Sequence, residues 1–148
     1  MQTKPTYSYS QLNTFHDCPY AWSRLYLDHV PRSGNFFAEY GTIIHSVLEE
    51  FAKGELQRDA LRDVFEWRFD TEIVETPPYN KYVELGPKYR QQGLDFFENF
   101  EGFDGLEIIG VEQHFKLDFD SYFLQGFIDL VYRDRDGKLI CRDWKSGS

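Results

Sequence analysis

Hydrophobic residues recur at helical spacing through the first two-thirds of the chain, residues 1–103. Ile44, Val47 and Leu48, for example, fall on one side of a helix with 3.6 residues per turn. Ser10 is expected to cap the first helical stretch, and Pro19 is expected to divide it, because a proline inside a helix removes a hydrogen bond. The pattern predicts helical stretches over residues 11–27, 42–53 and about 57–73, and another that begins near Pro87.

From residue 106 onward, hydrophobic and polar residues follow the two-residue period of strands. We expect a β-meander over residues 106–148, with strands at 106–118, 122–133 and 139–145 and a turn at Asp136-Gly137. The sequence ends at Ser148, which would leave the last strand as a bare sheet edge. Because proteins normally pair or cover such edges, a further C-terminal segment or a partner is expected there.

The composition favours a single globular domain over residues 1–148. Fourteen Phe and ten Tyr can fill a core in a chain of this length. Two cysteines, Cys18 and Cys141, are too few for a disulfide-stapled secreted scaffold. The N-terminus has no apolar stretch of signal-peptide type, and no run approaches the roughly 20 apolar residues of a membrane span. We therefore expect a cytoplasmic protein with no membrane partner.

The formal net charge of -9 argues against a broadly basic surface for nucleic acids, since affinity for them comes from neutralising phosphates. A basic groove is compatible with this total, and bound divalent cations offset local negative charge. The charge predicts that this chain alone holds DNA weakly. The sequence has no glycine-rich phosphate loop with its lysine, so no ATP-driven motor is expected.

One acidic residue, Asp129, lies inside an otherwise apolar strand segment, Gly-Phe-Ile-Asp-Leu-Val at residues 126–131. Burying a charge without a partner costs several kcal/mol, so a cation or a hydrogen-bond donor is expected beside it. Two explanations are open at this point. Asp129 contributes to a metal site, or it forms an ion pair with an arginine such as Arg142.

The loop before the last strand decides whether Asp129 and Asp143 meet. A two-residue turn would place their side chains on opposite faces of the sheet. A three-residue loop over residues 135–137, ending in a left-handed glycine, pairs Asp134 with Lys138 and sets the two aspartates opposite each other. We predict the three-residue loop, which brings two carboxylates so close that their repulsion demands a cation.

Lys145 lies two residues after Asp143, so the two side chains share a face of the strand. This arrangement suits phosphodiester cleavage. Two carboxylates hold a hard divalent ion, which polarises the phosphate and lowers the pKa of a bound water. Lys145 would orient that water or stabilise the charge that develops on the phosphate, and it is a general base only if its pKa is lowered.

Four motifs in order carry a family resemblance: Ser-x-Leu-x-x-x-x-x-Cys-Pro at 10–19, Gly-x-x-x-His at 41–45, Gly-Phe-Ile-Asp at 126–129 and Asp-Trp-Lys at 143–145. The last two resemble the motif of the PD-(D/E)XK nuclease superfamily. The first two are similar to its RecB-like branch, which includes the RecB and AddAB nuclease domains and the CRISPR-associated iron–sulfur nucleases. The resemblance spans nearly the whole chain.

This resemblance implies an α/β (α+β) fold with a restriction-endonuclease-like core, a short mixed sheet flanked by helices. The core would be truncated after its third strand, because the family's Gln-x-x-x-Tyr helix and its following strand are missing from the sequence. His45, Asp129 and Asp143 would be metal ligands, together with the backbone carbonyl of Trp144. Lys145, Asp129 and Asp143 would be the catalytic residues.

Two further acids are candidates for the surroundings of the metal. Glu112 matches a strand acid near such sites in the family. Glu49, one helical turn after His45, would hold the imidazole, or it is a solvated surface acid. His45 itself has an alternative, since a histidine next to Ile44 on an apolar helix face also fits a hydrogen-bonded core residue.

Cys18 raises the question of an iron–sulfur cluster. In family members with a 4Fe–4S cluster, the corresponding cysteine is the first of four ligands. Cys141 is on the catalytic strand and is not the expected second ligand, and two cysteines cannot build a four-thiolate cluster. We expect no cluster in this chain and a core position for Cys18, which would be an iron–sulfur ligand only if further cysteines lie downstream.

Together these patterns favour a Mg²⁺- or Mn²⁺-dependent deoxyribonuclease that hydrolyses phosphodiester bonds with a metal-activated water. An imidazole ligand shifts the preference toward manganese, and we expect more activity with manganese than with calcium. The resemblance implies an exonuclease on DNA ends or single strands, in repair, recombination or phage DNA processing, with a helicase as a candidate protein partner. Two alternatives are an inactive fragment or accessory module that binds a partner, and a structural metal site without hydrolysis.

Overall fold

The structure, a computed structural model, describes residues 4–145 and divides into two compact units. The first unit comprises Met1–Ser33 and Glu112–Ile128, and the second comprises Gly34–Val111 and Asp129–Ser148. Strands β2 (Glu107–Asp118) and β3 (Phe123–Arg133) contribute residues to both units. Within residues 4–145, no helix is both long enough and apolar enough to cross a membrane.

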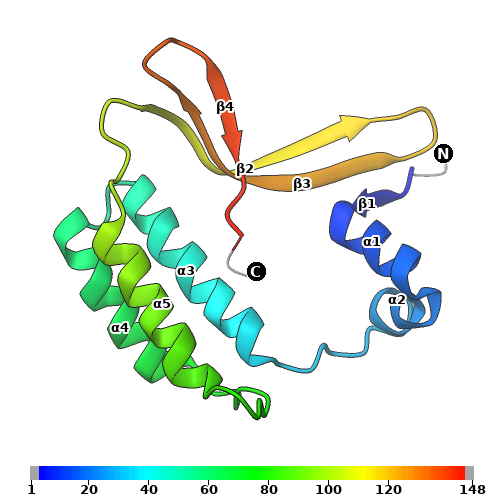
Figure 1. Ribbon diagram of the computed structural model, residues 1–148. Helices are drawn as coiled ribbons and strands as arrows, with labels where there is room; N and C mark the ends of the chain where they lie inside the picture. The colour runs from blue at the N-terminus through cyan, green and yellow to red at the C-terminus, as the bar shows by residue number, and fades with distance from the viewer. Residues whose placement is uncertain (1–3, 146–148) are drawn as a thin grey trace. The chain divides into compact units, whose positions relative to one another are not determined.

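The N-terminal part of the first unit is a short strand followed by two helices (Figure 1). These elements are β1 (Thr6–Ser8), α1 (Tyr9–Asp17) and α2 (Pro19–Tyr26). Pro19 separates the two helices as predicted. The predicted cap at Ser10 is wrong, because Ser8 is the extended residue whose Oγ accepts the N–H of Gln11 at 3.2 Å. Helix α1 therefore begins earlier than the sequence indicated.

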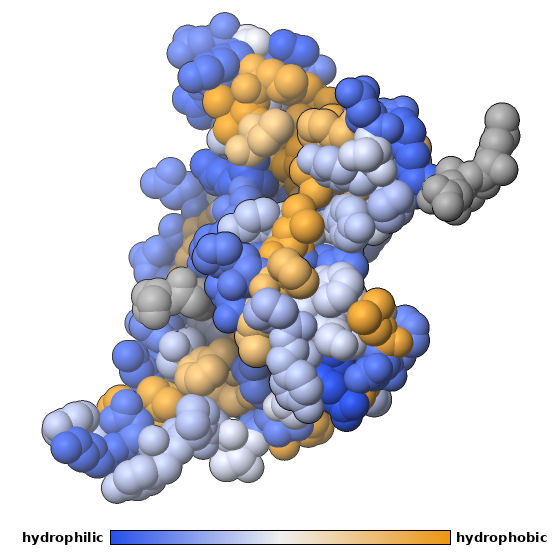
Figure 2. Space-filling model, turned by 90° about the vertical axis from the view of Figure 1, so that its right-hand side faces the viewer, coloured by the Kyte–Doolittle hydropathy of each residue, from blue (hydrophilic) through white to orange (hydrophobic). Residues whose placement is uncertain are grey.

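No side chain of the first unit is fully buried among the residues that the structure describes. Its helices contact each other through the rings of Phe15 and Trp22, whose centroids are 5.4 Å apart. Leu12 and Leu27 are exposed, and Figure 2 shows hydrophobic residues at the surface among hydrophilic ones. The main hydrophobic core therefore lies in the second unit.

Three helices pack in the second unit, with α4 in contact with both α3 and α5 (Figure 1). They are α3 (Phe36–Ala52), α4 (Leu61–Glu72), preceded by the 3₁₀ turn η1 (Arg58–Ala60), and α5 (Leu85–Asn99).

The core between these helices buries Tyr40. Burial raises the pKa of Tyr40 to about 12, and the neighbouring Tyr89 acts in the same direction. The buried core consists of Tyr40, Ile43, Ile44, Val47, Leu48, Leu61, Phe65, Leu94 and Phe97.

Helix α3 begins before the predicted start at Thr42. Its N-cap is Asn35, whose Oδ1 accepts the N–H of Ala38 at 2.9 Å. The side chains of Phe36 and Tyr40 are buried, so packing holds the additional turns as well. These turns matter because α3 is the helix that carries His45.

Replacing Asn35 by alanine is expected to lower the free energy of unfolding by about 1 kcal/mol, because alanine cannot accept this N–H. The midpoint of urea unfolding, followed by circular dichroism, measures the loss. Asn99→Ala is the control, since Asn99 ends α5 and donates to the carbonyl of Asp95 on the exposed surface. This control should lose no more than about 0.5 kcal/mol, and equal losses in both variants would contradict the role of Asn35.

Helices α4 and α5 meet where α5 carries a glycine. A Cβ atom added at Gly93 would lie 2.0 Å from Cζ of Phe65. Phe65 is fully buried, and its ring contacts the rings of Phe69 and Phe97. The two helices can therefore approach this closely only because position 93 has no side chain.

The four strands form one mixed sheet. Strand β3 pairs in parallel with β1 and antiparallel with β4 (Leu139–Arg142), and β2 is also its neighbour. The expected short mixed sheet with helices is confirmed. The sequence predicted three strands and missed β1, because three residues are too few to show a two-residue period.

The loop between β3 and β4 has the predicted three residues, 135–137. The N–H of Asp134 donates to the carbonyl of Lys138 at 3.0 Å, and the N–H of Gly137 donates to the carbonyl of Asp134 at 3.0 Å. Gly137 has a φ of 80°, a left-handed conformation that glycine adopts without steric penalty.

This loop sets the strand register. The last pair within β4 is Leu130 opposite Arg142. This is the register that the sequence predicted; continued by one residue it would set Asp129 opposite Asp143, but β4 ends at Arg142.

Candidate metal site

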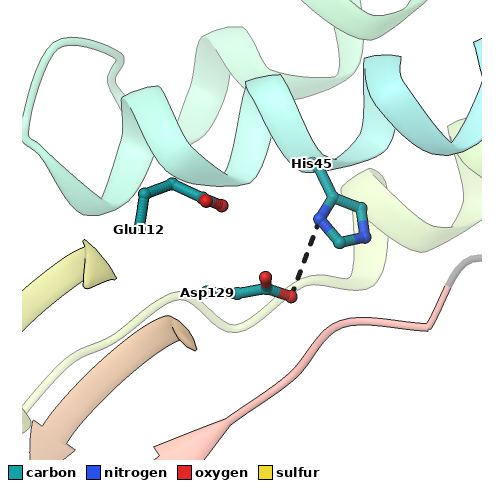
Figure 3. A group of neighbouring side chains, drawn as sticks. All are labelled: His45, Glu112 and Asp129. Carbon is teal, nitrogen blue, oxygen red and sulfur yellow. Dashed lines mark ion pairs between the residues drawn. The ribbon is translucent and has the colours of Figure 1, made fainter. Parts of the chain in front are cut away.

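Helix α3 and strand β3 each supply one polar side chain to the candidate site within the second unit. His45 follows the buried Ile44 on α3, and its side chain is 32% exposed, whereas the side chain of Asp129 is only 12% exposed. Nδ1 of His45 and Oδ2 of Asp129 are 3.6 Å apart (Figure 3). This is longer than an ordinary hydrogen bond, so the two groups face each other without one.

Glu112 makes this pair a group of three potential metal ligands. It directly follows Val111 in β2. One ligand atom from each of His45, Glu112 and Asp129 can be chosen so that all three lie within 4.8 Å of one another (Figure 3). The sequence placed Glu112 only in the surroundings of the metal.

The backbone of Glu112 is also unusual. Its φ of 48° is left-handed, which is uncommon for a residue other than glycine and more so within a strand. Such a conformation costs on the order of 1–3 kcal/mol, and residues of this kind cluster at functional sites. No feature of the sequence pattern indicated it.

The main chain of Trp144 lies beside Asp129. The N–H of Trp144 donates to Oδ2 of Asp129 at 2.6 Å. This hydrogen bond explains why β4 ends at Arg142 and not at the predicted Lys145, because here the backbone donates to a side chain. The aspartate gains a donor that the sequence did not reveal.

The indole ring of Trp144 is held from several sides. Its centroid lies 6.4 Å from the ring of Phe100 and 6.3 Å from the ring of Phe103. The guanidinium of Arg142 lies 5.0 Å from the indole and 5.4 Å from the ring of Tyr132. Arg142 is thus engaged with aromatic rings, and the alternative of an Asp129–Arg142 ion pair is not what the structure shows.

Asp143 and Lys145 form an ion pair with each other, with 2.5 Å between Oδ2 and Nζ. Both side chains are largely exposed. Asp143 follows the end of β4, and its carboxylate is not among the three ligand groups that come together. The structure therefore brings together His45, Glu112 and Asp129, with the backbone of Trp144, and places the Asp143–Lys145 pair on the segment that follows β4.

The other two candidates lie elsewhere. Glu49 forms an ion pair with Lys53 one turn further along α3. Cys18 is exposed and caps α2, where its Sγ accepts the N–H of Ala21 at 3.4 Å. The expected core position for Cys18 is therefore wrong, because a side chain at a helix cap points to the N–H groups of the first turn and not into a core.

The chemistry of the three-residue group fits a divalent cation. Two carboxylates and one imidazole offer the oxygen ligands that Mg²⁺ prefers and the mixed set that Mn²⁺ accepts. Two ligands at about 2.1 Å from one octahedral ion are roughly 3 Å apart. The separation of 3.6 Å between His45 and Asp129 is near this value.

Comparison with known sequences shows the family of the chain. Residues 6–148 match the PD-(D/E)XK nuclease superfamily. The chain belongs to this superfamily. Its mixed α/β fold with a short sheet is consistent with the restriction-endonuclease-like core of such nucleases, which use divalent metal ions. The RecB-like branch stays a prediction.

One relative of this PD-(D/E)XK protein is the "Gene 69 protein" of Mycobacterium phage D29. It is 29% identical over 97% of the chain and 63% of its own length. The chain thus spans somewhat less than two-thirds of that relative.

Proposed function

We propose that this chain is a divalent-metal-dependent deoxyribonuclease of the PD-(D/E)XK superfamily. The convergence of one imidazole and two carboxylates, from His45, Glu112 and Asp129, carries the proposal. A bound Mg²⁺ or Mn²⁺ would supply Lewis-acid polarisation of the scissile phosphate and would acidify a water molecule. Magnesium and manganese both suit this donor set, and the imidazole favours manganese.

The residues around the group have distinct roles in this proposal. His45, Asp129 and Glu112 hold the ion, and the backbone N–H of Trp144 fixes the orientation of the Asp129 carboxylate. The backbone carbonyl of Trp144 and the carboxylate of Asp143 are further candidate ligands. Both are on the segment that this N–H ties to the site.

Lys145 is the proposed cationic group of the reaction. Its ammonium group is exposed and pairs with Asp143, so a phosphate that approaches the segment would meet a positive charge held by a neighbouring acid. There it would orient the attacking water and stabilise the negative charge that develops on the phosphate. Asp143 would then position Lys145, in addition to any contact with the ion.

The finer activity belongs to the proposal as well. We infer an exonuclease that acts on DNA ends or single strands, and similarity to a phage protein supports a role in phage DNA processing, with repair and recombination as related settings. A helicase or a further segment of the same protein is the proposed partner. The acidic net charge supports such help, because this chain has few cations with which to hold DNA.

A cleavage assay with the purified chain tests the proposal. Linear single-stranded, linear double-stranded and circular single-stranded DNA are incubated with Mn²⁺, Mg²⁺, Ca²⁺ or EDTA. We expect degradation of linear DNA with Mn²⁺ and Mg²⁺, weaker or no degradation with Ca²⁺, and none with EDTA. An exonuclease spares the circles, so cleaved circles would overturn that part of the proposal.

Two lysine variants control for contaminating nuclease. Lys145→Ala should remove nearly all activity. Lys138→Ala, next to the loop of the same hairpin, should retain it, because Lys138 pairs with Asp134 through its backbone. Activity that survives Lys145→Ala would argue against this assignment. No cleavage, together with no manganese binding by calorimetry, would favour an accessory module, and tight binding without cleavage would favour a structural metal site.

A further inference from the structure

The segment between α4 and α5 carries two highly exposed tyrosines. Tyr79 is 92% exposed and Tyr82 is 82% exposed, which makes them the most exposed of the large apolar side chains that the structure describes. Neither ring takes part in a ring–ring contact with another described aromatic side chain. Both rings are therefore accessible to a ligand and are not needed to fill a core.

The backbone around these tyrosines is held in place. The carboxylate of Glu39 on α3 accepts the N–H of Val74 at 3.0 Å and the N–H of Glu75 at 2.9 Å. Further along, the N–H of Tyr82 donates to Oδ1 of Asn80 at 2.9 Å. Two prolines at 77 and 78 fix φ between these points. A loop that is ordered beforehand loses less entropy when it binds.

The charge of this segment differs from that of the whole chain. Residues 76–83 contain Lys81 and no acid, although the chain has 25 acids and a net charge of -9. Nζ of Lys81 lies 4.6 Å from the centre of the Tyr82 ring. A cation beside an exposed ring suits a nucleotide, because the cation can pair with the phosphate and the ring can stack on the base.

The segment also borders a hollow of about 390 Å³, within the range of small-ligand sites. Its wall is mostly apolar, formed by prolines and the ring of Tyr79, and Asn80 and Glu84 are its polar members.

The loop and the candidate metal site share one helix. Glu39, which anchors the loop, precedes His45 by six positions on α3, or about 9 Å along the helix axis. Both belong to the second unit. The loop, His45 and Asp129 all belong to this unit, so one flexible strand could contact the loop and reach these two residues.

We propose that residues 76–83 bind single-stranded nucleic acid, with Tyr79 and Tyr82 stacked on bases and Lys81 paired with a backbone phosphate. The inference rests on the proposed nuclease function, whose substrates it narrows from DNA ends or single strands to single strands, and it adds a second contact region. It also explains how an acidic nuclease can hold its substrate: stacking supplies affinity that does not depend on net charge.

The test is a binding titration of fluorescent oligothymidylate of about 15 nucleotides in EDTA, where cleavage does not interfere. The double variant Tyr79→Ala/Tyr82→Ala should bind at least about tenfold more weakly. Tyr79→Phe/Tyr82→Phe should stay within about twofold, because the ring stacks and the hydroxyl does not. Lys81→Gln should weaken binding and lower the slope of log affinity against log salt by about 1.

The matched control is Tyr9→Ala/Tyr20→Ala, which removes two tyrosines of similar exposure, 77% and 74%, from the first unit. Binding by this control should be unchanged. The inference is overturned by loop variants that bind like the wild type, by equal losses in both double variants, or by a wild type that does not bind single strands. Thermal melting confirms that each variant is folded.

Cleavage assays separate this inference from the proposed function. Binding that depends on Tyr79 and Tyr82 in a chain that never cleaves DNA would support the loop and overturn the nuclease. Cleavage by a chain whose binding does not depend on these tyrosines would support the nuclease and overturn the loop inference. If both hold, the loop variants should raise KM for single strands more than they lower kcat.

Discussion

Replacing Asp129 by asparagine is expected to lower the rate of metal-dependent DNA cleavage by at least about 10³-fold. The loss of one charged ligand removes several kcal/mol of stabilisation that a well-held ion supplies, and about 4 kcal/mol corresponds to this factor. The fold should survive, because the asparagine oxygen can still accept the N–H of Trp144. Single-turnover cleavage with saturating manganese measures the effect.

Asp136→Asn is the matched control, since Asp136 is in the loop of the same hairpin and takes part in it through its backbone N–H. Its rate should stay within about twofold of the wild type. A rate for Asp129→Asn within tenfold of the wild type would refute the central role of this carboxylate. Manganese should also raise the melting temperature of the wild type and of the Asp136 variant, but not of the Asp129 variant.

The same assays rank the two remaining acids. The structure groups Glu112, and not Asp143, with His45 and Asp129, whereas the family resemblance made Asp143 the ligand. If the grouped residues hold the ion, Glu112→Gln should lose more of the manganese stabilisation than Asp143→Asn does. The opposite order would show that the ion draws Asp143 away from Lys145 when it binds.

Replacing Gly93 by alanine should destabilise the second unit by about 1–3 kcal/mol, even though alanine is the better helix former. The new methyl group would collide with the ring of Phe65. That ring has no room to retreat, because it is fully buried against Phe69 and Phe97. Thermal unfolding should shift down by about 3–10 °C for a chain of this size.

Two variants show whether the collision is the cause. Gly86→Ala lies in the same helix, where a Cβ would meet only Pro77 at an ordinary 3.6 Å, so it should be neutral or slightly stabilising. Phe65→Leu removes the ring edge that the methyl group strikes. The double variant Gly93→Ala/Phe65→Leu should therefore be more stable than the sum of the two single losses. Strict additivity would argue against this contact.

The helices were predictable from the sequence because their apolar stripes are long. The stripe of Ile44, Val47 and Leu48 does face the core, and Pro19 does divide α1 from α2. The first residues of the helices were harder to predict, since they depend on which polar side chain accepts a backbone N–H of the first turn. Ser8 and Asn35 do so, whereas the sequence pattern had indicated Ser10 for the first helix.

Individual residues of the candidate site were easier to predict than the way in which they come together. The register of β3 and β4 was predictable from the loop with Gly137, because turn chemistry is local and glycine tolerates the required φ. The hydrogen bond from the N–H of Trp144 to the carboxylate of Asp129 could not be predicted, because a strand pattern assumes that a backbone N–H pairs with the backbone of the next strand. The left-handed backbone of Glu112 was equally hidden, since nothing about a glutamate in a strand signals it.

The length of the three-residue loop at 135–137 determines how β3 and β4 of the hairpin are aligned. A substitution of the Asp136 side chain changes an exposed group, whereas a single inserted or deleted residue would move the side chains of β4 to the opposite face of the sheet, because side chains alternate along a strand. Trp144 would then present its indole where its N–H now meets Asp129. The length of this loop is therefore more constrained than the identity of its exposed side chains, and a graft of this hairpin into another protein must keep both the three-residue spacing and Gly137.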